Sequence, residues 1–159
     1  MITNSHVYQK MKIDRSKPLD LKFIIKDNDW IIEEQDERSL AITELDPMKI
    51  QLKITFKEGE TCVIGAENLR RINKSSYIWL DAKILQTLLE NPALIPESWK
   101  KKTNNSGTFI FFPGTVLIDS KGERYILSLF CHCGVWRTHC CCLVYDWKIN
   151  HPSAVLEVS

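Results

Sequence analysis

Two extended runs meet at a tight turn in the stretch RYILSLFCHCGVWRTHCCCLVY, residues 124–145. The runs 124–130 and 136–145 are rich in β-branched, aromatic and other apolar residues, and Cys133-Gly134 between them provides a glycine for the turn. With a two-residue turn, His132 lies opposite Val135, and each later pair follows, down to Tyr125 opposite Cys142. The stretch therefore predicts a long antiparallel hairpin with a defined register.

Alternation along the second run of this hairpin predicts which side chains share a face. One face carries the large anchor Trp136 with Thr138, Cys140, Cys142 and Val144. The other face carries unlike side chains that do not resemble a packed core, and such a mixture suits contact with a partner, in which Arg and Tyr are enriched. We expect the ligand-binding residues on this outward face to be Phe130, His132, Val135, Arg137, His139, Cys141 and Tyr145.

Working outward, the runs 109–112 and 115–118 add two further extended segments before the hairpin, separated by Pro113-Gly114. Residues 106–159 are therefore predicted to be a small antiparallel C-terminal β-sheet. So small a sheet needs support, and we expect its apolar face to pack on the upstream part of the chain, with the Ile84/Leu88 helix as one candidate.

Residues 1–105 are predicted to form a mixed α/β scaffold, which makes the fold class α+β. Helices are expected over 66–73 and over 82–90, the second capped by Asp81 and stopped by Pro92. Extended segments are expected over 21–26 and 30–34 as a hairpin, over 39–45, and over 50–57, where apolar and polar residues alternate. The polar run 100–107 is expected to be a linker between the two regions.

Composition limits the function classes. With 159 residues, 21 Lys+Arg and 20 Asp+Glu, the chain is one domain's length and carries a net charge of +1. This charge is too small for general attraction to phosphate, so nucleic acid is an unlikely partner unless a local patch forms from Arg70, Arg71, Lys74 and Lys100 to Lys102. No stretch approaches the length of a membrane span and residues 1–17 lack the apolar centre of a signal peptide, so we expect a cytoplasmic protein.

The cysteines suggest two alternatives to a binding face. Zinc takes four Cys or His ligands, and a metal-binding or metal-sensing module could use Cys131, Cys133, Cys140, Cys142 and His139. In the predicted register, however, Cys131 and Cys140 lie about 13 Å apart, at about 3.3 Å per residue, which is too far for one ion. A thiol enzyme centred on Cys141 and aided by His139 is the other alternative, for which no orienting carboxylate is identifiable.

Several motifs along the chain resemble those of a family of bacterial proteins without an assigned activity. They are IPESWK at 95–100, IFFPGTVL at 110–117, RYILSL at 124–129, GVW at 134–136, DW at 146–147 and PSAVL at 152–156, with DERSLAITELD at 36–46 and Leu69-Arg70-Arg71 upstream. The C-termini of this family look like the variable regions of diversity-generating retroelements, in which an error-prone reverse transcriptase rewrites adenines of asparagine codons.

The resemblance implies which positions vary. In relatives the tail alternates aromatic anchors with asparagines, and the positions that fall on asparagines here are His132, His139, Cys141, Tyr145, Asn150 and His151, with Val135 and Arg137 as additions. An Asn codon ending in C or T reaches His or Tyr by one adenine change, and Cys, Val or Arg by two. Cys131, Thr138, Cys140 and Cys142 stand where relatives look aromatic, Cys133 stands where they look like Gly, and Lys148 is not reachable by adenine change alone.

The resemblance implies a non-enzymatic binding protein that presents a hypervariable face of the C-terminal sheet to a protein or other macromolecular ligand, without a cofactor. Proteins diversified in this way often use a C-type-lectin-like fold, which is therefore the second prediction for the fold, after the α+β arrangement given above. Zinc binding by the C-terminal Cys/His cluster remains the alternative function.

Overall fold

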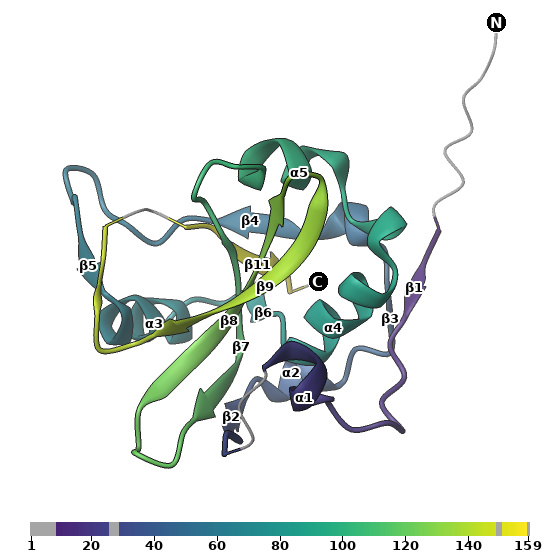
Figure 1. Cartoon of the computed structure of the whole chain (residues 1–159), viewed down its shortest axis with the longest axis horizontal. Helices are drawn as coiled ribbons and strands as arrows, with labels where there is room; N and C mark the ends of the chain where they lie inside the picture. The colour runs from purple at the N-terminus through teal and green to yellow at the C-terminus, as the bar shows by residue number, and fades with distance from the viewer. Residues whose placement is uncertain (1–8, 26–28, 149–150, 159) are drawn as a thin grey trace, which may run out of the picture.

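The computed structural model of the chain describes residues 9–25, 29–148 and 151–158, and confirms the α+β class (Figure 1). Its strands form one seven-stranded mixed sheet and two small two-stranded sheets.

None of the helices in these three ranges has the length and apolar composition that a membrane crossing requires. The strands are β1 (Met11–Lys12), β2 (Ile31–Gln35), β3 (Glu44–Leu45), β4 (Gln51–Lys53), β5 (Val63–Ile64), β6 (Ile78–Trp79), β7 (Ile110–Ile118), β8 (Arg124–His132), β9 (Val135–Cys142), β10 (Asp146–Trp147) and β11 (Ser153–Leu156). The helices are α1 (Leu21–Ile24), α2 (Glu37–Leu40), α3 (Gly65–Asn73), α4 (Ala82–Glu90) and α5 (Glu97–Thr103), with 3-10 turns at Pro47–Lys49 and Pro92–Leu94.

The seven-stranded sheet takes strands from both ends of the chain. Its main order is β4-β11-β7-β8-β9, with β2 beside β7 and β6 beside β11. The pairs β7–β8 and β8–β9 are antiparallel, as expected for the C-terminal region, whereas β11 runs parallel to β7. The predicted regions 1–105 and 106–159 therefore share one sheet, since β2, β4 and β6 come from the first region.

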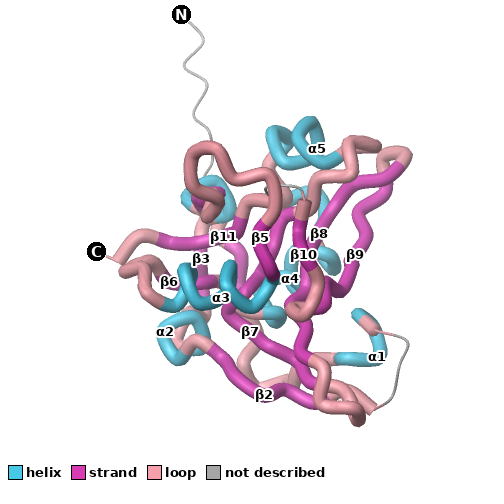
Figure 2. Tube along the Cα trace, turned by 90° about the vertical axis from the view of Figure 1, so that its left-hand side faces the viewer, coloured by secondary structure: helices cyan, strands magenta, loops and turns pink. Residues whose placement is uncertain are grey.

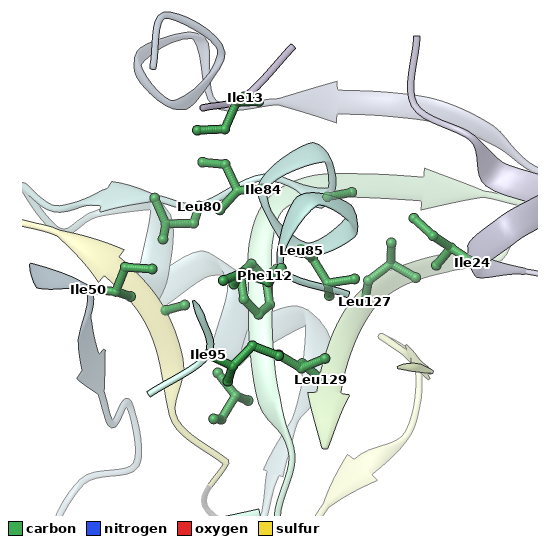
Figure 3. Packing of buried hydrophobic residues seen from close by; sticks show 14 of the residues in the cluster. Ile13, Ile24, Ile50, Leu80, Ile84, Leu85, Ile95, Phe112, Leu127 and Leu129 are labelled. Carbon is green, nitrogen blue, oxygen red and sulfur yellow. The ribbon is translucent and has the colours of Figure 1, made fainter. Parts of the chain in front are cut away.

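Helix α4 covers one face of this sheet and supplies the centre of the core. Ile84, Leu85 and Leu88 of α4 are fully buried in one cluster with Phe112 of β7 and Leu127 of β8. Figure 3 shows Leu85 and Phe112 together at the middle of this packing. The expectation that the C-terminal sheet packs on the Ile84/Leu88 helix is confirmed.

Asp81 anchors the start of α4. Its carboxylate accepts backbone N–H bonds from Lys83 and Ile84, as an N-cap residue does, so the expected cap is confirmed. The same carboxylate is wholly buried and forms an ion pair with Arg15 at 2.9 Å, and it accepts the hydroxyl of Ser39 at 2.5 Å. One acidic side chain thus ties α4 to both the N-terminal segment and α2.

Helix α3 and the segment after β9 cover the other face, with α3 and the β5–β10 pair on the near side in Figure 2. Trp147 and Leu143 pack there with Phe111 and Leu69. Gly65 begins α3 directly against them, because a Cβ at this position would lie 2.8 Å from the Cα of Leu143 and 2.9 Å from the ring of Trp147. Both faces of the sheet are therefore covered over much of their area.

Two predictions of extended segments in the N-terminal region are wrong. Residues 21–24 form α1, so the expected hairpin with 30–34 is absent; β2 instead pairs with β7. Lys26, Asp27 and Asn28 of that hairpin lie outside the described residues. Residues 37–40 form α2 because Asp36 caps it through the backbone N–H of Arg38, and only Glu44–Leu45 of the expected strand 39–45 is extended in a strand.

Two other boundaries also differ. The alternation at 50–57 yields only the three-residue β4, since Ile54 is 55% exposed and has left the sheet. The segment expected as a linker, 100–107, begins inside α5, which extends to Thr103. Trp99 and Thr103 are buried and hold this helix on the core, while the three lysines between them are exposed or half-buried.

Pro113-Gly114 does not separate two strands. Both residues lie within β7, where the register with β8 shifts between Phe112 and Val116. The shift brings the chain against β6: a Cβ on Gly114 would lie 2.1 Å from the carbonyl oxygen of Trp79. Glycine is required here because no side chain fits between the two backbones.

Candidate functional site

The β8–β9 hairpin has the register that the sequence predicts. His132 lies opposite Val135, and the pairs continue without a break to Tyr125 opposite Cys142. At the turn, Cys133 has φ 49° and Gly134 has φ 76°. Positive φ at both central residues gives the twist that a two-residue hairpin turn needs. The tip lies beside α5 (Figure 1), where the Cys133 N–H donates to Asn105 Oδ1 at 3.3 Å.

The inner face of β9 is fixed to the core. Trp136 and Cys140 are half-buried and pack against the cluster formed by α4, β7 and β8. Thr138 lies between them, and its hydroxyl donates to the carbonyl oxygen of Ile24 at 3.2 Å. These three positions therefore hold the hairpin on the body of the protein.

The outward face begins with four exposed residues, His132, Val135, Arg137 and His139. Val135 is 53% exposed although its side chain is apolar. Arg137 forms no ion pair within residues 9–25, 29–148 and 151–158, and Phe130, its partner across the hairpin, is half-buried. The structure brings Phe130 and these four residues, all predicted from the sequence, onto one face.

The other two predicted binding residues lie elsewhere. Cys141 follows the same alternation, but it is half-buried against the cluster of Phe111 and Trp147. Tyr145 lies beyond the end of β9 and is 66% exposed, and its carbonyl oxygen accepts the Gly65 N–H at 3.0 Å. Leu143, which the alternation places on the outward face, lies on the same side as Cys141 but is buried in that cluster. Val144, which the alternation places on the inner face, is 56% exposed.

An aromatic cluster supports the outward face from its side. The ring of Phe109 lies 5.0 Å from those of Phe130 and His139 and stacks on His151 at 5.1 Å, measured between centroids. The sequence analysis missed Phe109 as a site residue. The register of β7 against β8 places it there: Phe111 pairs with Ser128, so Phe109 lies beside Phe130 across the ladder.

His151 is the most perturbed member of this cluster. It is 9% exposed, and its Nδ1 accepts the backbone N–H of Phe109 at 3.0 Å, which requires an unprotonated Nδ1. Burial, with a smaller contribution from nearby His139, lowers the pKa of His151 from 6.5 to about 4. Of the positions that the resemblance implies to vary, His151 is thus internal, and Asn150 lies outside the described residues.

The alternative zinc ligands are not brought together. Within residues 9–25, 29–148 and 151–158, no group of three or more His, Cys, Asp or Glu side chains could hold a metal ion. Cys131 is buried opposite Trp136 near the tip, whereas Cys142 is buried at the other end of β9, opposite Tyr125. The unbroken register separates these ligands along the strand.

The thiol of Cys141 is not activated. Burial raises its pKa to about 12, so almost none of it is thiolate near neutral pH. Burial also raises the pKa of Cys140 to about 11. In the described part of the chain, no hydrogen bond joins His139 to Cys141.

Five of the six basic residues considered for nucleic acid fall into two groups. Arg71 forms ion pairs with Glu60 at 2.7 Å and Glu67 at 3.1 Å, and Arg70 pairs with Glu67 at 2.5 Å, so acidic partners offset these charges. Lys100 to Lys102 lie in the last turn of α5, where cations suit the helix dipole. These lysines have a local structural reason to be there.

Comparisons of the chain with protein-family models, with curated proteins and with solved structures found no match.

Proposed function

We propose that this chain is a non-enzymatic binding protein that presents the outward face of the β8–β9 hairpin to a macromolecular partner, and that a diversity-generating retroelement varies this face. The observation that carries the proposal is the division of β9 into two sets of residues. Positions that the resemblance implies to vary, Val135, Arg137 and His139, are exposed, while Trp136, Thr138 and Cys140 between them hold the hairpin on the core.

This division is what a diversified surface needs physically. Exposed substitutions away from caps and strained positions usually change stability by less than about 0.5 kcal/mol, so many sequences at the outward positions are compatible with one fold. The hairpin register is fixed by the turn and by the inner face, so a change at Arg137 leaves the direction of its neighbours unaltered. All six cysteines lie in the described residues as free thiols, which suits the reducing cytoplasm that we propose as its compartment.

The direct test of the proposal is in the DNA. We expect the DNA flanking the gene to contain a second copy of the stretch that encodes Leu129 to Ser159. The two copies should differ only at positions where the second copy carries adenine, and a reverse-transcriptase gene should lie beside it. A flanking region without either element would refute diversification by a retroelement.

The protein provides a second test of the proposed face. We expect the triple variant Val135→Asn, Arg137→Asn, His139→Asn to keep the urea-unfolding free energy within about 1 kcal/mol of the parent. The matched inner-face variant Trp136→Asn, Cys140→Asn should lose at least about 2 kcal/mol, because it places amides in the half-buried contacts with the core. Equal losses in the two variants would contradict the proposed division of roles.

A further inference from the structure

Strand β9 is an open edge of the seven-stranded sheet. Among residues 9–25, 29–148 and 151–158 it pairs with β8 alone, and the Leu143 N–H donates to the Arg124 carbonyl at 2.9 Å just beyond its last pair. Because hydrogen-bonded and non-bonded pairs alternate in an antiparallel ladder, this bond fixes the phase of the whole hairpin. The backbone N–H and C=O groups of Trp136, Thr138 and Cys140 therefore point away from β8. No described residue forms a hydrogen bond with these six groups.

The other ends of the sheet are protected in ways that β9 is not. Strand β4 has only three residues, and β2 carries Glu33 and Glu34 and has an irregular register between Ile32 and Glu34. Short length, charge and bulges are the common means of blocking edge pairing. Strand β9 has eight residues, no proline, an unbroken register and Arg137 as its one charged residue.

The side chains along this edge include a cation but no acidic group. The segment 125–145 contains no Asp or Glu, while Arg137 and His139 are exposed on the outward face. On the inner face, Trp136 and Cys140 border the edge with half-buried apolar surface. A strand laid beside β9 would thus meet the Arg137 guanidinium and the His139 imidazole on one face and apolar groups on the other.

We infer that β9 binds its partner by strand addition: an extended segment of another protein, with carboxylates alternating with apolar residues, pairs antiparallel with Val135–Cys142. The inference rests on the proposed function, because it names the partner class and the binding mode of the same hairpin. The outward-pointing backbone groups bind the segment, and the Arg137 guanidinium selects its carboxylates, beside the His139 imidazole as a hydrogen-bond donor.

The register of such an added strand can be tested with a synthetic peptide, acetyl-Ser-Glu-Val-Glu-Val-Glu-Ser-amide. In antiparallel addition with glutamates beside Arg137, the valine N–H groups face β9 and the glutamate N–H groups face solvent. We expect N-methylation of both valines to weaken binding at least tenfold, and N-methylation of the glutamates to change it less than twofold. A peptide with Lys in place of Glu should also bind at least tenfold more weakly.

Variants of the full chain test the edge from the protein side. Thr138→Pro removes an N–H that the β8 ladder does not use, so the fold should persist and peptide binding should fall at least tenfold. Thr138→Val removes the bond to Ile24 but keeps the N–H, and should bind the peptide like the parent. If Thr138→Pro does not fold, binding of the two methylated peptides to the unmodified protein still tests whether the added strand bonds to β9.

Several results would overturn strand addition. These are equal binding of the two methylated peptides, loss with the methylated glutamates alone, no binding of the parent peptide, and no slowing of hydrogen exchange at the Trp136, Thr138 and Cys140 amides. Dimerisation of the free protein that Thr138→Pro abolishes would identify a second copy as the occupant and overturn the inference as well. If the flanking DNA contains a template copy and any of these results is also found, the proposed function is supported and only the strand-addition mode is refuted.

Discussion

Acid should destabilise this fold through His151. The folded chain holds its imidazole neutral, because it is buried and because Nδ1 accepts the Phe109 N–H at 3.0 Å. In the unfolded chain the same ring has an ordinary pKa near 6.5, against about 4 in the folded chain. Between these two values the unfolded chain binds a proton that the folded chain does not, so the free energy of unfolding falls as the pH falls.

The size of this effect follows from the two pKa values. A difference from 6.5 to about 4 corresponds to about 3 kcal/mol when it is lost completely, below the folded-state pKa. We expect a loss of about 2 kcal/mol between pH 7.5 and pH 4.5, because pH 4.5 lies above that pKa and water screens part of the ring edge. The stability from this group is fully present above pH 6.5.

Urea unfolding at the two pH values measures the loss. His151→Asn retains an oxygen that can accept the Phe109 N–H but does not titrate, so its loss over the same interval should be about 2 kcal/mol smaller than that of the parent. His132→Asn is the matched control, because His132 is exposed at the hairpin tip, and it should lose as much as the parent. Equal losses in the parent and in His151→Asn would refute the assignment of acid sensitivity to this ring.

Three further predictions concern the fold and the thiols. Asp81→Asn keeps a capping oxygen but removes one charge from the buried ion pair of α4, and should lower the unfolding free energy by about 3 kcal/mol in urea titrations. Gly114→Ala should destabilise by about 3 kcal/mol because its Cβ would meet a backbone carbonyl at 2.1 Å, whereas Gly122→Ala, at φ +82° with open space around it, should cost about 1 kcal/mol; similar melting temperatures for the two would contradict this. In the native protein at pH 7, Cys133 is exposed and should react rapidly with a thiol reagent, while Cys141 should react only on unfolding; rapid modification of Cys141, identified by mass spectrometry, would revive the thiol-enzyme hypothesis.

The hairpin could be predicted from the sequence because its information is local. A two-residue turn at Cys133-Gly134 determines every later pair, and the alternation determines the faces as far as the strand extends. Helix α4 was equally accessible, because Asp81 and its apolar stripe signal both its start and its buried face. The point at which the outward face becomes covered could not be read locally, because Leu143 is buried there by Trp147 and by the start of α3 at Gly65.

The remaining errors arise from tertiary packing that no short window contains. The segment 21–24 becomes a helix with Ile24 buried beside Leu127, although its residue types suit a strand. Three lysines and a threonine become the end of α5 because Trp99 and Thr103, both buried, anchor the helix on the core. The part played by Phe109 likewise depends on the register of β7 against β8, which the bulge at Pro113-Gly114 shifts.

The central place of β11 affects how the chain is made. Strand β11 follows the hairpin in the sequence and yet lies between β4 and β7, with β6 also bonded to it. On the ribosome, β4 and β6 emerge long before the strand that joins them to the rest of the sheet, so the sheet closes only after residues 153–156 have left the exit tunnel. A translation product that stops within the hairpin would lack this strand and present unpaired sheet edges to proteases and chaperones, so a change in the hairpin is displayed on a complete sheet only in chains that also contain residues 153–156.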